Sequence, residues 1–224
     1  MASLSLSVDE LLTTTRTVRR RLDLRRDVPR SVVEECLELA FQAPVGHNAQ
    51  DWGWVIIEDE EVRRRAADIY RRGFFALAEK YAVDSSGDDD GPAAAEPTPE
   101  MKRMFADSVY LADHMCDVPK LLVAVIGPML GSTTTFEQAT RWGSILQAVW
   151  SFHLALRSRG LGSAWTTSHL FFEDEMAELL HIPDGYAQAG MFPIAYTIGT
   201  EFRPADRSLT KSRIFWDGWA QRTT

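Results

Sequence analysis

The amino-acid sequence predicts an α+β fold in a single domain that spans residues 1–224. Several segments carry apolar residues at helical spacing, whereas short continuous apolar runs rich in β-branched residues are typical of buried strands. The predicted helices and strands do not alternate strictly, which argues against a parallel βαβ sheet and favours the α+β class. The chain length suits one compact domain that needs no disulfide or metal for stability.

Capping residues and apolar stripes predict the helices. Residues 7–10, Ser-Val-Asp-Glu, match a capping box, so a first helix should begin near position 8. Pro29 suits the first turn of a second helix, which Ala43-Pro44 stops before a loop at 45–48. Further helices are expected at 60–81, in a segment that ends near Met115, from a cap at 135–138 to Gly160, and just before Ile182-Pro183.

Four strands are expected, at 54–57, 121–126, 163–166 and 192–198. Residues 84–100 are rich in Asp, Gly, Pro and Ala, a composition that cannot bury a core. We therefore expect a mobile excursion at 84–100. The tail from residue 199 onward shows no clear period.

Charge and cysteine content limit the possible functions. The net charge of 24 minus 32, or −8, argues against general nucleic-acid binding. Seven arginines nevertheless lie between positions 16 and 30, which favours either a small anionic ligand or a solvated helix end. No secretory leader or apolar run of about 20 residues is present, and the two cysteines are isolated, so we expect a cytoplasmic protein that does not cross a membrane.

The sequence contains no evident catalytic nucleophile or metal site. The five histidines lack partners at ligand spacing, and Ser163 is not in the frame of a nucleophile elbow. Glycine-rich nucleotide motifs are also missing. Trp142, Val149 and His153 are expected in the core or an interface rather than in contact with substrate. A chain of this kind can take its reactivity from a bound cofactor, so no catalytic side chain is assigned.

Three separate segments could hold such a cofactor. Residues 16–23 carry alternate arginines that can turn toward one anion, and guanidinium groups bind phosphate through charge-assisted hydrogen bonds. Residues 43–52 supply a helix stop, a glycine that lets backbone approach a flat ligand, and a side-chain amide. Residues 211–213, Lys-Ser-Arg, place two cations on one side of an extended segment.

The order of these motifs resembles the nitroreductase-like family of FMN-dependent oxidoreductases, from about position 11 to 217. The matching motifs are Leu22-Asp23 after the arginines, the loop at 43–52, Gly160-Leu161-Gly162-Ser163, His181-Ile182-Pro183, and Lys211-Ser212-Arg213 with Trp216-Asp217 beyond. The resemblance implies a nitroreductase-like fold, with a central mixed, mostly antiparallel sheet flanked by helices. It also implies a homodimer with swapped arms and FMN at the subunit interface.

The resemblance assigns cofactor-binding residues at both ends of the chain. It implies that Arg16, Arg20, Lys211 and Arg213 bind the FMN phosphate, with Thr17 and Val18 beside it. It places Pro44, Val45, Gly46 and Asn48 against the flavin from the partner subunit, and Trp165, Thr166 and Thr167 near the flavin N5 edge.

Departures from the family pattern concern the ring end of the site. Val18 and Val45 stand where serine is usual, and Asp51 stands where proline is common. The implied function is transfer of reducing equivalents from NAD(P)H through FMN to a nitroaromatic- or quinone-like acceptor. The alternatives are a specialised flavin enzyme of the same fold, performing reductive dehalogenation or flavin fragmentation, and a flavin-binding protein without turnover.

Overall fold

A computed structural model describes residues 3–84, 97–128, 134–211 and 213–219, except for the side chains of residues 81–84, 209 and 211. Most of the expected excursion, residues 85–96, lies outside the described residues. The excursion was expected to continue to residue 100, which is wrong, because helix α4 (Pro99–His114) already begins at Pro99. Thr98 caps this helix by accepting a hydrogen bond from the Met101 N–H. A threonine followed by proline begins a helix here rather than prolonging a loop.

The centre of the molecule is a four-stranded sheet in the order β1-β2-β4-β3. Its strands are β1 (Trp52–Ile57), β2 (Lys120–Ile126), β3 (Leu161–Gly162) and β4 (Ala187–Tyr196). All of these strand pairs are antiparallel. The sheet was expected to be mixed and mostly antiparallel. Among the described residues, its parallel pairing is one isolated bridge between Thr17 and Ser163.

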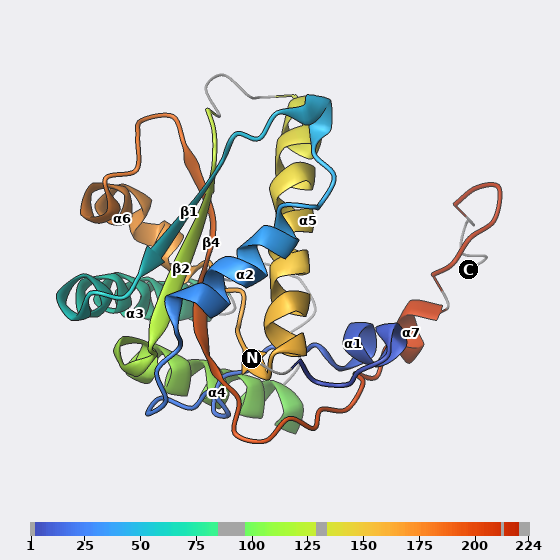
Figure 1. Ribbon diagram of the computed structural model, residues 1–224, viewed down its shortest axis with the longest axis horizontal. Coiled ribbons are helices and arrows are strands. Elements are labelled where there is room, and N and C mark those ends of the chain that lie inside the picture. Colours follow the sequence, from blue (N-terminus) through green and yellow to red (C-terminus); the bar gives the residue numbers. More distant parts are fainter. Residues whose placement is uncertain (1–2, 85–96, 129–133, 212, 220–224) are drawn as a thin grey trace.

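Helices surround this sheet (Figure 1). They are α1 (Val8–Thr14), α2 (Arg30–Ala40), η1 (Gly46–Asn48), α3 (Glu60–Asp84), α4, η2 (Met115–Asp117), α5 (Thr135–Ser158), η3 (Ser168–Phe172), α6 (Glu173–Leu180) and α7 (Ser208–Lys211). The capping box predicted for α1 is present at Ser7 and Glu10. A second one begins α5 at Thr134, one residue before the expected cap.

The two faces of the sheet bury separate hydrophobic clusters because alternate residues of a strand point to opposite sides. On one face, Leu122, Ala124 and Ile126 of β2 pack with α2 and α5. On the other face, Leu121, Val123 and Val125 pack with α3, α4 and α6. Figure 1 shows these helices on opposite sides of the strands, so the fold is three-layered and α+β as predicted.

Two strand predictions need correction. The short strand expected at 163–166 is at Leu161–Gly162, and Ser163 and Thr166 form only isolated bridges. The strand expected at 192–198 begins at Ala187 and ends at Tyr196. Its first half includes Gln188 and Gly190, which hid the strand from a search for continuous apolar residues. Pro29, expected inside the second helix, is its N-cap residue.

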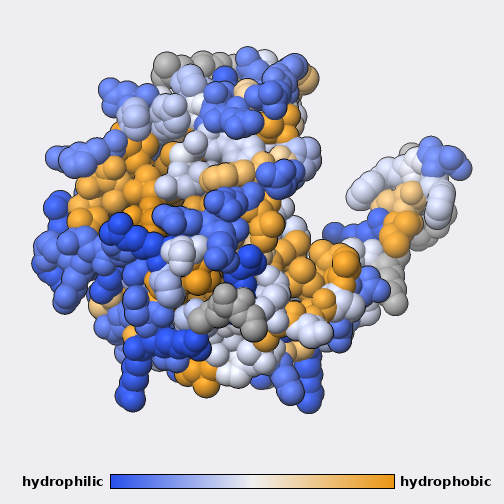
Figure 2. Space-filling view, viewed as in Figure 1, coloured by the Kyte–Doolittle hydropathy of each residue, from blue (hydrophilic) through white to orange (hydrophobic). Residues whose placement is uncertain are grey.

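The chain leaves the body of the molecule after α7. Figures 1 and 2 show residues 213–219 extending away from the other elements and carrying apolar surface. Ile214, Trp216 and Trp219 in this segment are 67%, 86% and 80% exposed. None of the helices in the described ranges combines the length and the apolar character needed to span a bilayer.

Candidate functional site

A cavity of about 500 Å³ lies between the N-terminal segment, α4, α5 and the chain after β3. We call it the arginine cavity. Its lining residues are Thr15, Arg16, Thr17, Arg19, Glu100, Met104, Val149, Trp150, His153, Trp165 and Arg207. Its volume lies within the range of about 300–1,000 Å³ that is typical of small-molecule sites.

The segment 15–18 is held against β3 by backbone contacts. The Val18 N–H donates to the Ser163 carbonyl over 2.9 Å, and Thr17 bridges Ser163. Val18 itself is buried. Gly162 permits this close approach, because a Cβ at that position would lie 2.9 Å from both Cβ and Cγ2 of Val18. The packing fixes the backbone that carries Arg16.

Positive charge predominates in the cavity. Arg16, Arg19 and Arg207 line it, and none of them appears in an ion pair within the described ranges. Glu100, at the start of α4, is the carboxylate on its wall. Three guanidinium groups facing one carboxylate favour a ligand with negative charge.

One wall of the cavity is aromatic and carries a neutral histidine. The Trp150 and His153 rings are nearly parallel, with centroids 6.4 Å apart. Burial lowers the pKa of His153 to about 4, so its imidazole is uncharged at neutral pH. Its Nε2 is buried and has no hydrogen-bond partner in the described part of the chain. An unsatisfied ring nitrogen beside a cavity is available to a polar group of a ligand.

Trp165 projects its ring from the chain after β3. Its indole N–H donates to the Ala189 carbonyl over 3.1 Å, and the residue remains 45% exposed. Gly190 makes room for it, because a Cβ there would lie 2.6 Å from the indole nitrogen. The next residue, Thr166, donates both its N–H and its hydroxyl to the Met191 carbonyl, at 3.2 and 2.6 Å. Thr167, the residue that follows, is exposed.

The structure does not bring every predicted phosphate ligand to the arginine cavity. Arg20 pairs with Asp107 and stacks on Tyr110, with its guanidinium carbon 4.7 Å from the ring centroid. Arg213 is exposed on the extended C-terminal segment. The side chain of Lys211 lies outside the described part of the chain. Their role in phosphate binding stays a prediction.

Sequence reasoning missed two of the cavity's arginines. Arg19 belongs to the recognised cluster, but the resemblance assigned the phosphate to its neighbour Arg20. A turn closes here through a hydrogen bond from the Leu22 N–H to the Arg19 carbonyl, and Arg19 rather than Arg20 lines the cavity. Arg207 lies in the tail, which gave no pattern from which to select it.

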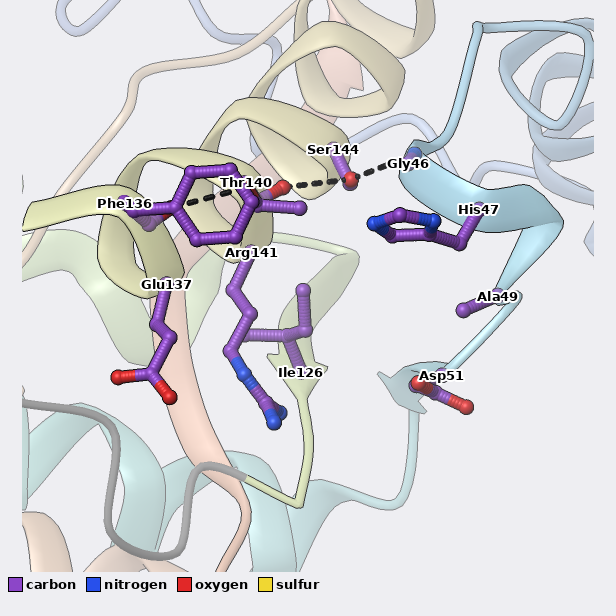
Figure 3. A pocket seen from close by; sticks show the side chains of 10 residues that line it. All are labelled: Gly46, His47, Ala49, Asp51, Ile126, Phe136, Glu137, Thr140, Arg141 and Ser144. Carbon is purple, nitrogen blue, oxygen red and sulfur yellow. Dashed lines mark hydrogen bonds between the residues drawn. The ribbon is translucent and has the colours of Figure 1, made fainter. Parts of the chain in front are cut away.

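The predicted flavin-contacting loop lies elsewhere on the same chain. Pro44 and Asn48 are exposed, and Val45 and Gly46 are half-buried. The Gly46 N–H donates to Ser144 Oγ over 3.1 Å, and that hydroxyl donates to the Thr140 carbonyl over 2.8 Å (Figure 3). These residues belong to a second pocket, in which His47 and Asp51 of the loop face Phe136 and Arg141 of α5.

Helix α5 separates this loop from the arginine cavity. Ser144 and Val149, the nearest residue of α5 that lines the arginine cavity, are five residues apart, which corresponds to about 7.5 Å along the helix axis. None of the four predicted loop residues lines the arginine cavity. Their contact with a flavin, which the resemblance assigns to the partner subunit, stays a prediction.

The comparisons with known proteins agree with this fold. The model of the Nitroreductase family matches residues 12–196. The chain belongs to the Nitroreductase family. A 4-nitrobenzoate reductase from Nocardioides sp. (strain LMS-CY) is 27% identical over 232 residues, which cover 93% of this chain and 90% of that protein.

Solved structures of nitroreductase-like proteins share the architecture. Oxidised iodotyrosine deiodinase bound to FMN and 3-iodo-L-tyrosine superposes with a TM-score of 0.66 at 19% identity, over 97% of this chain and 100% of that one. The FMN- and NADPH-dependent nitroreductase NfnB from Sphigopyxis sp. strain HMH gives a TM-score of 0.64 at 17% identity, over 96% and 100%. At these identities the likeness establishes the nitroreductase-like fold.

Within the described ranges, no group of three or more His, Cys, Asp or Glu side chains is arranged to hold a metal ion. The arginine cavity offers three guanidinium groups, one carboxylate, aromatic rings and one neutral imidazole. These groups can bind and orient a flat, anionic molecule.

Proposed function

We propose that this member of the Nitroreductase family is an FMN-dependent oxidoreductase that passes reducing equivalents from NAD(P)H to a nitroaromatic- or quinone-like acceptor. The observation that carries the proposal is the arginine cavity, where three arginines without ion-pair partners in the described ranges lie beside an exposed Trp165. The names of two relatives, a 4-nitrobenzoate reductase and an FMN- and NADPH-dependent nitroreductase, support it.

The residues of the cavity fit FMN. A phosphate is a dianion near neutral pH, and Arg16, Arg19 and Arg207 offer it guanidinium donors. The unsatisfied Nε2 of His153 is suited to a polar group of the cofactor or substrate. Thr17 and the backbone around Val18 would lie beside the phosphate, as part of the same cavity wall as Arg16. In this proposal Arg19 and Arg207 take the place at first given to Arg20.

The ring end of the cofactor would lie against the turn at 165–167. The N–H and the hydroxyl of Thr166 both donate to the Met191 carbonyl. The N–H or hydroxyl of Thr167 is therefore the better candidate for a hydrogen bond to the flavin N5 edge. When bound, the flavin supplies the redox chemistry by accepting two electrons from a nicotinamide and giving them to the acceptor. The protein binds and orients both partners and contributes no covalent step of its own.

A homodimer belongs to the proposal. Pro44, Val45, Gly46 and Asn48 of a second copy would close the cavity, because none of these residues of the same chain lines it. Strand β1 is an edge strand, and edge strands readily accept pairing. The exposed apolar arm at 213–219 would cover the partner and carry Lys211 and Arg213 with it.

The proposed compartment is the cytoplasm. Cys36 and Cys116 are both free thiols, which suits a reducing environment.

Two measurements test the function. Apoprotein titrated with FMN should quench flavin fluorescence at micromolar concentration and become yellow. The loaded protein should then oxidise NADH or NADPH when 4-nitrobenzoate or menadione is added. A protein that stays colourless and takes up no FMN refutes the proposal, and one that binds FMN without reduction by either nicotinamide refutes its catalytic part.

Two arginine variants test the phosphate assignment. Arg16→Ala should weaken FMN binding about 10- to 150-fold, which corresponds to the roughly 1.5–3 kcal/mol of a hydrogen bond to a charged group. Arg20→Ala is the matched control, because its guanidinium already pairs with Asp107. Riboflavin, which lacks the phosphate, should bind both variants alike. An equal loss of FMN affinity in the two variants would restore Arg20 as a phosphate ligand and contradict our choice.

A further inference from the structure

A second arginine site adjoins the arginine cavity, with which it shares Thr15, Arg16 and His153 as lining residues. Arg157, in the last turn of α5, is only 5% exposed. Its Nη2 donates to Thr14 Oγ1 over 3.2 Å, but its buried Nε and Nη1 have no hydrogen-bond partner among the described residues. The C-terminal end of a helix favours a nearby cation, yet none of the last carbonyls of α5 accepts from these two nitrogens.

Among the described residues, no carboxylate forms an ion pair with the Arg157 guanidinium. The carboxylate of Glu10, which lines a neighbouring pocket with Arg157, is engaged by the Ser7 N–H and hydroxyl at 2.8 Å each. A buried guanidinium without a counter-charge is strongly unfavourable.

The nearest ionic neighbours increase the positive charge. The guanidinium groups of Arg21 and Arg157 both stack on Phe202, at 4.1 and 4.9 Å from its ring centroid. Arg21 donates to the Ile198 and Glu201 carbonyls, which are neutral acceptors. Burial and the charge of Arg21 both lower the pKa of Arg157. Two cations on one phenyl ring repel each other, and an anion close by would reduce this repulsion.

A small closed space adjoins Arg157. Arg16, His153, Phe202 and Ser163 also line it. The hydroxyl of Ser163, a residue only 3% exposed, has no hydrogen-bond partner in the described ranges. The space has room for about one particle the size of a water molecule. Unused guanidinium N–H groups and an unused hydroxyl around such a space are the donors that a small anion requires.

We propose that Arg157, Ser163 and Arg16 bind one small monatomic anion, of the size of chloride. The anion neutralises the charge of the buried Arg157 guanidinium. By binding Arg157 of α5 and Arg16 of the segment 15–18 together, it stabilises the packing of that segment against the helix. A space of this size excludes the phosphate of a nucleotide. The inference does not rest on the proposed flavin chemistry, because it concerns charges that the fold itself buries.

Thermal unfolding of the purified protein tests this site. At constant ionic strength, replacing sodium gluconate by sodium chloride should raise Tm in a saturable way, whereas sulfate should not. Arg157→Met should abolish the response or weaken the apparent chloride affinity by at least about tenfold. Arg159→Met is the matched control, since Arg159 lies on the same helix and pairs with Glu35. Ser163→Ala should weaken the response too, and it serves if Arg157→Met does not fold.

Crystals soaked in bromide give a direct readout through anomalous scattering. A peak within hydrogen-bond distance of Arg157 and Ser163 supports the site. A wild-type Tm without a chloride response, or an equal response in Arg157→Met, overturns it. A third outcome also overturns the proposal. If Arg157→Met loses affinity for FMN but not for riboflavin, and does not respond to chloride, then Arg157 binds the flavin phosphate.

Discussion

The packing of α3 against η3 yields a prediction with a definite sign. A Cβ at Gly73 would lie 2.0 Å from the Ser168 carbonyl oxygen and 2.8 Å from its carbonyl carbon. These are backbone atoms, so no side-chain rotation relieves the overlap, and η3 must move away from α3. Overpacking of this kind costs about 3 kcal/mol at the upper end of its usual range, and alanine returns about 1 kcal/mol of helix propensity.

Gly73→Ala should therefore destabilise the protein by about 2 kcal/mol, which lowers Tm by about 4–8 °C for a domain of this size. Urea unfolding followed by tryptophan fluorescence measures the change. The control is Gly143→Ala in α5, where an added Cβ meets nothing within 4 Å. That variant should be stabilised by up to about 1 kcal/mol. A Gly73→Ala protein as stable as the wild type would show that the α3–η3 contact is looser than described.

Three further outcomes are expected. Burial lowers the pKa values of His153 and His169 to about 4, so the unfolded chain binds their protons first. The free energy of unfolding should then fall between about pH 6.5 and 4, by up to roughly 1.4 kcal/mol per pH unit for each histidine, and His153→Gln should flatten that slope. Burial raises the pKa of Cys36 to about 11, so at pH 8 a thiol reagent should label it only in denaturant. Gly162→Ala, whose Cβ would lie 2.9 Å from Val18, should displace the segment 15–18 and weaken FMN binding more than it lowers Tm.

The sequence predicted those elements whose signal is local. The capping box at Ser7, the apolar stripe of α2 and the β-branched run in β2 each depend on residues a few positions apart, and each is confirmed. Strand β4 was only half recognised, because its first residues owe their place to pairing with β2 across a bulge between Ala124 and Val125. Pairing between segments that are distant in the sequence does not require a periodic pattern of apolar residues in the strand itself.

The candidate site shows the same division. Arg16 and Trp165 could be selected from motifs, whereas the separation of Arg19 from Arg20 depends on Asp107, which is 87 residues away. Arg157 could have been noticed, because it follows Val149 and His153 at intervals of four on a face of α5 that is otherwise buried or lines the cavity. A charged residue at such a position signals a buried partner, although the sequence does not say which.

Helix α5 sets the spacing of the whole site. The middle of the helix carries the Ser144 hydroxyl that binds Gly46, and its C-terminal part carries His153 and Arg157. In the proposed dimer, each active site draws one half from either subunit. A dimer mixed from Arg16→Ala and loop-defective chains would concentrate both lesions in one site and leave its sister site intact. At an FMN concentration too low to load the Arg16→Ala site, two impaired proteins would then recover about a quarter of the wild-type turnover on random mixing, because half of the dimers are mixed and each of these has one intact site. Isolated monomers could not show this subunit complementation.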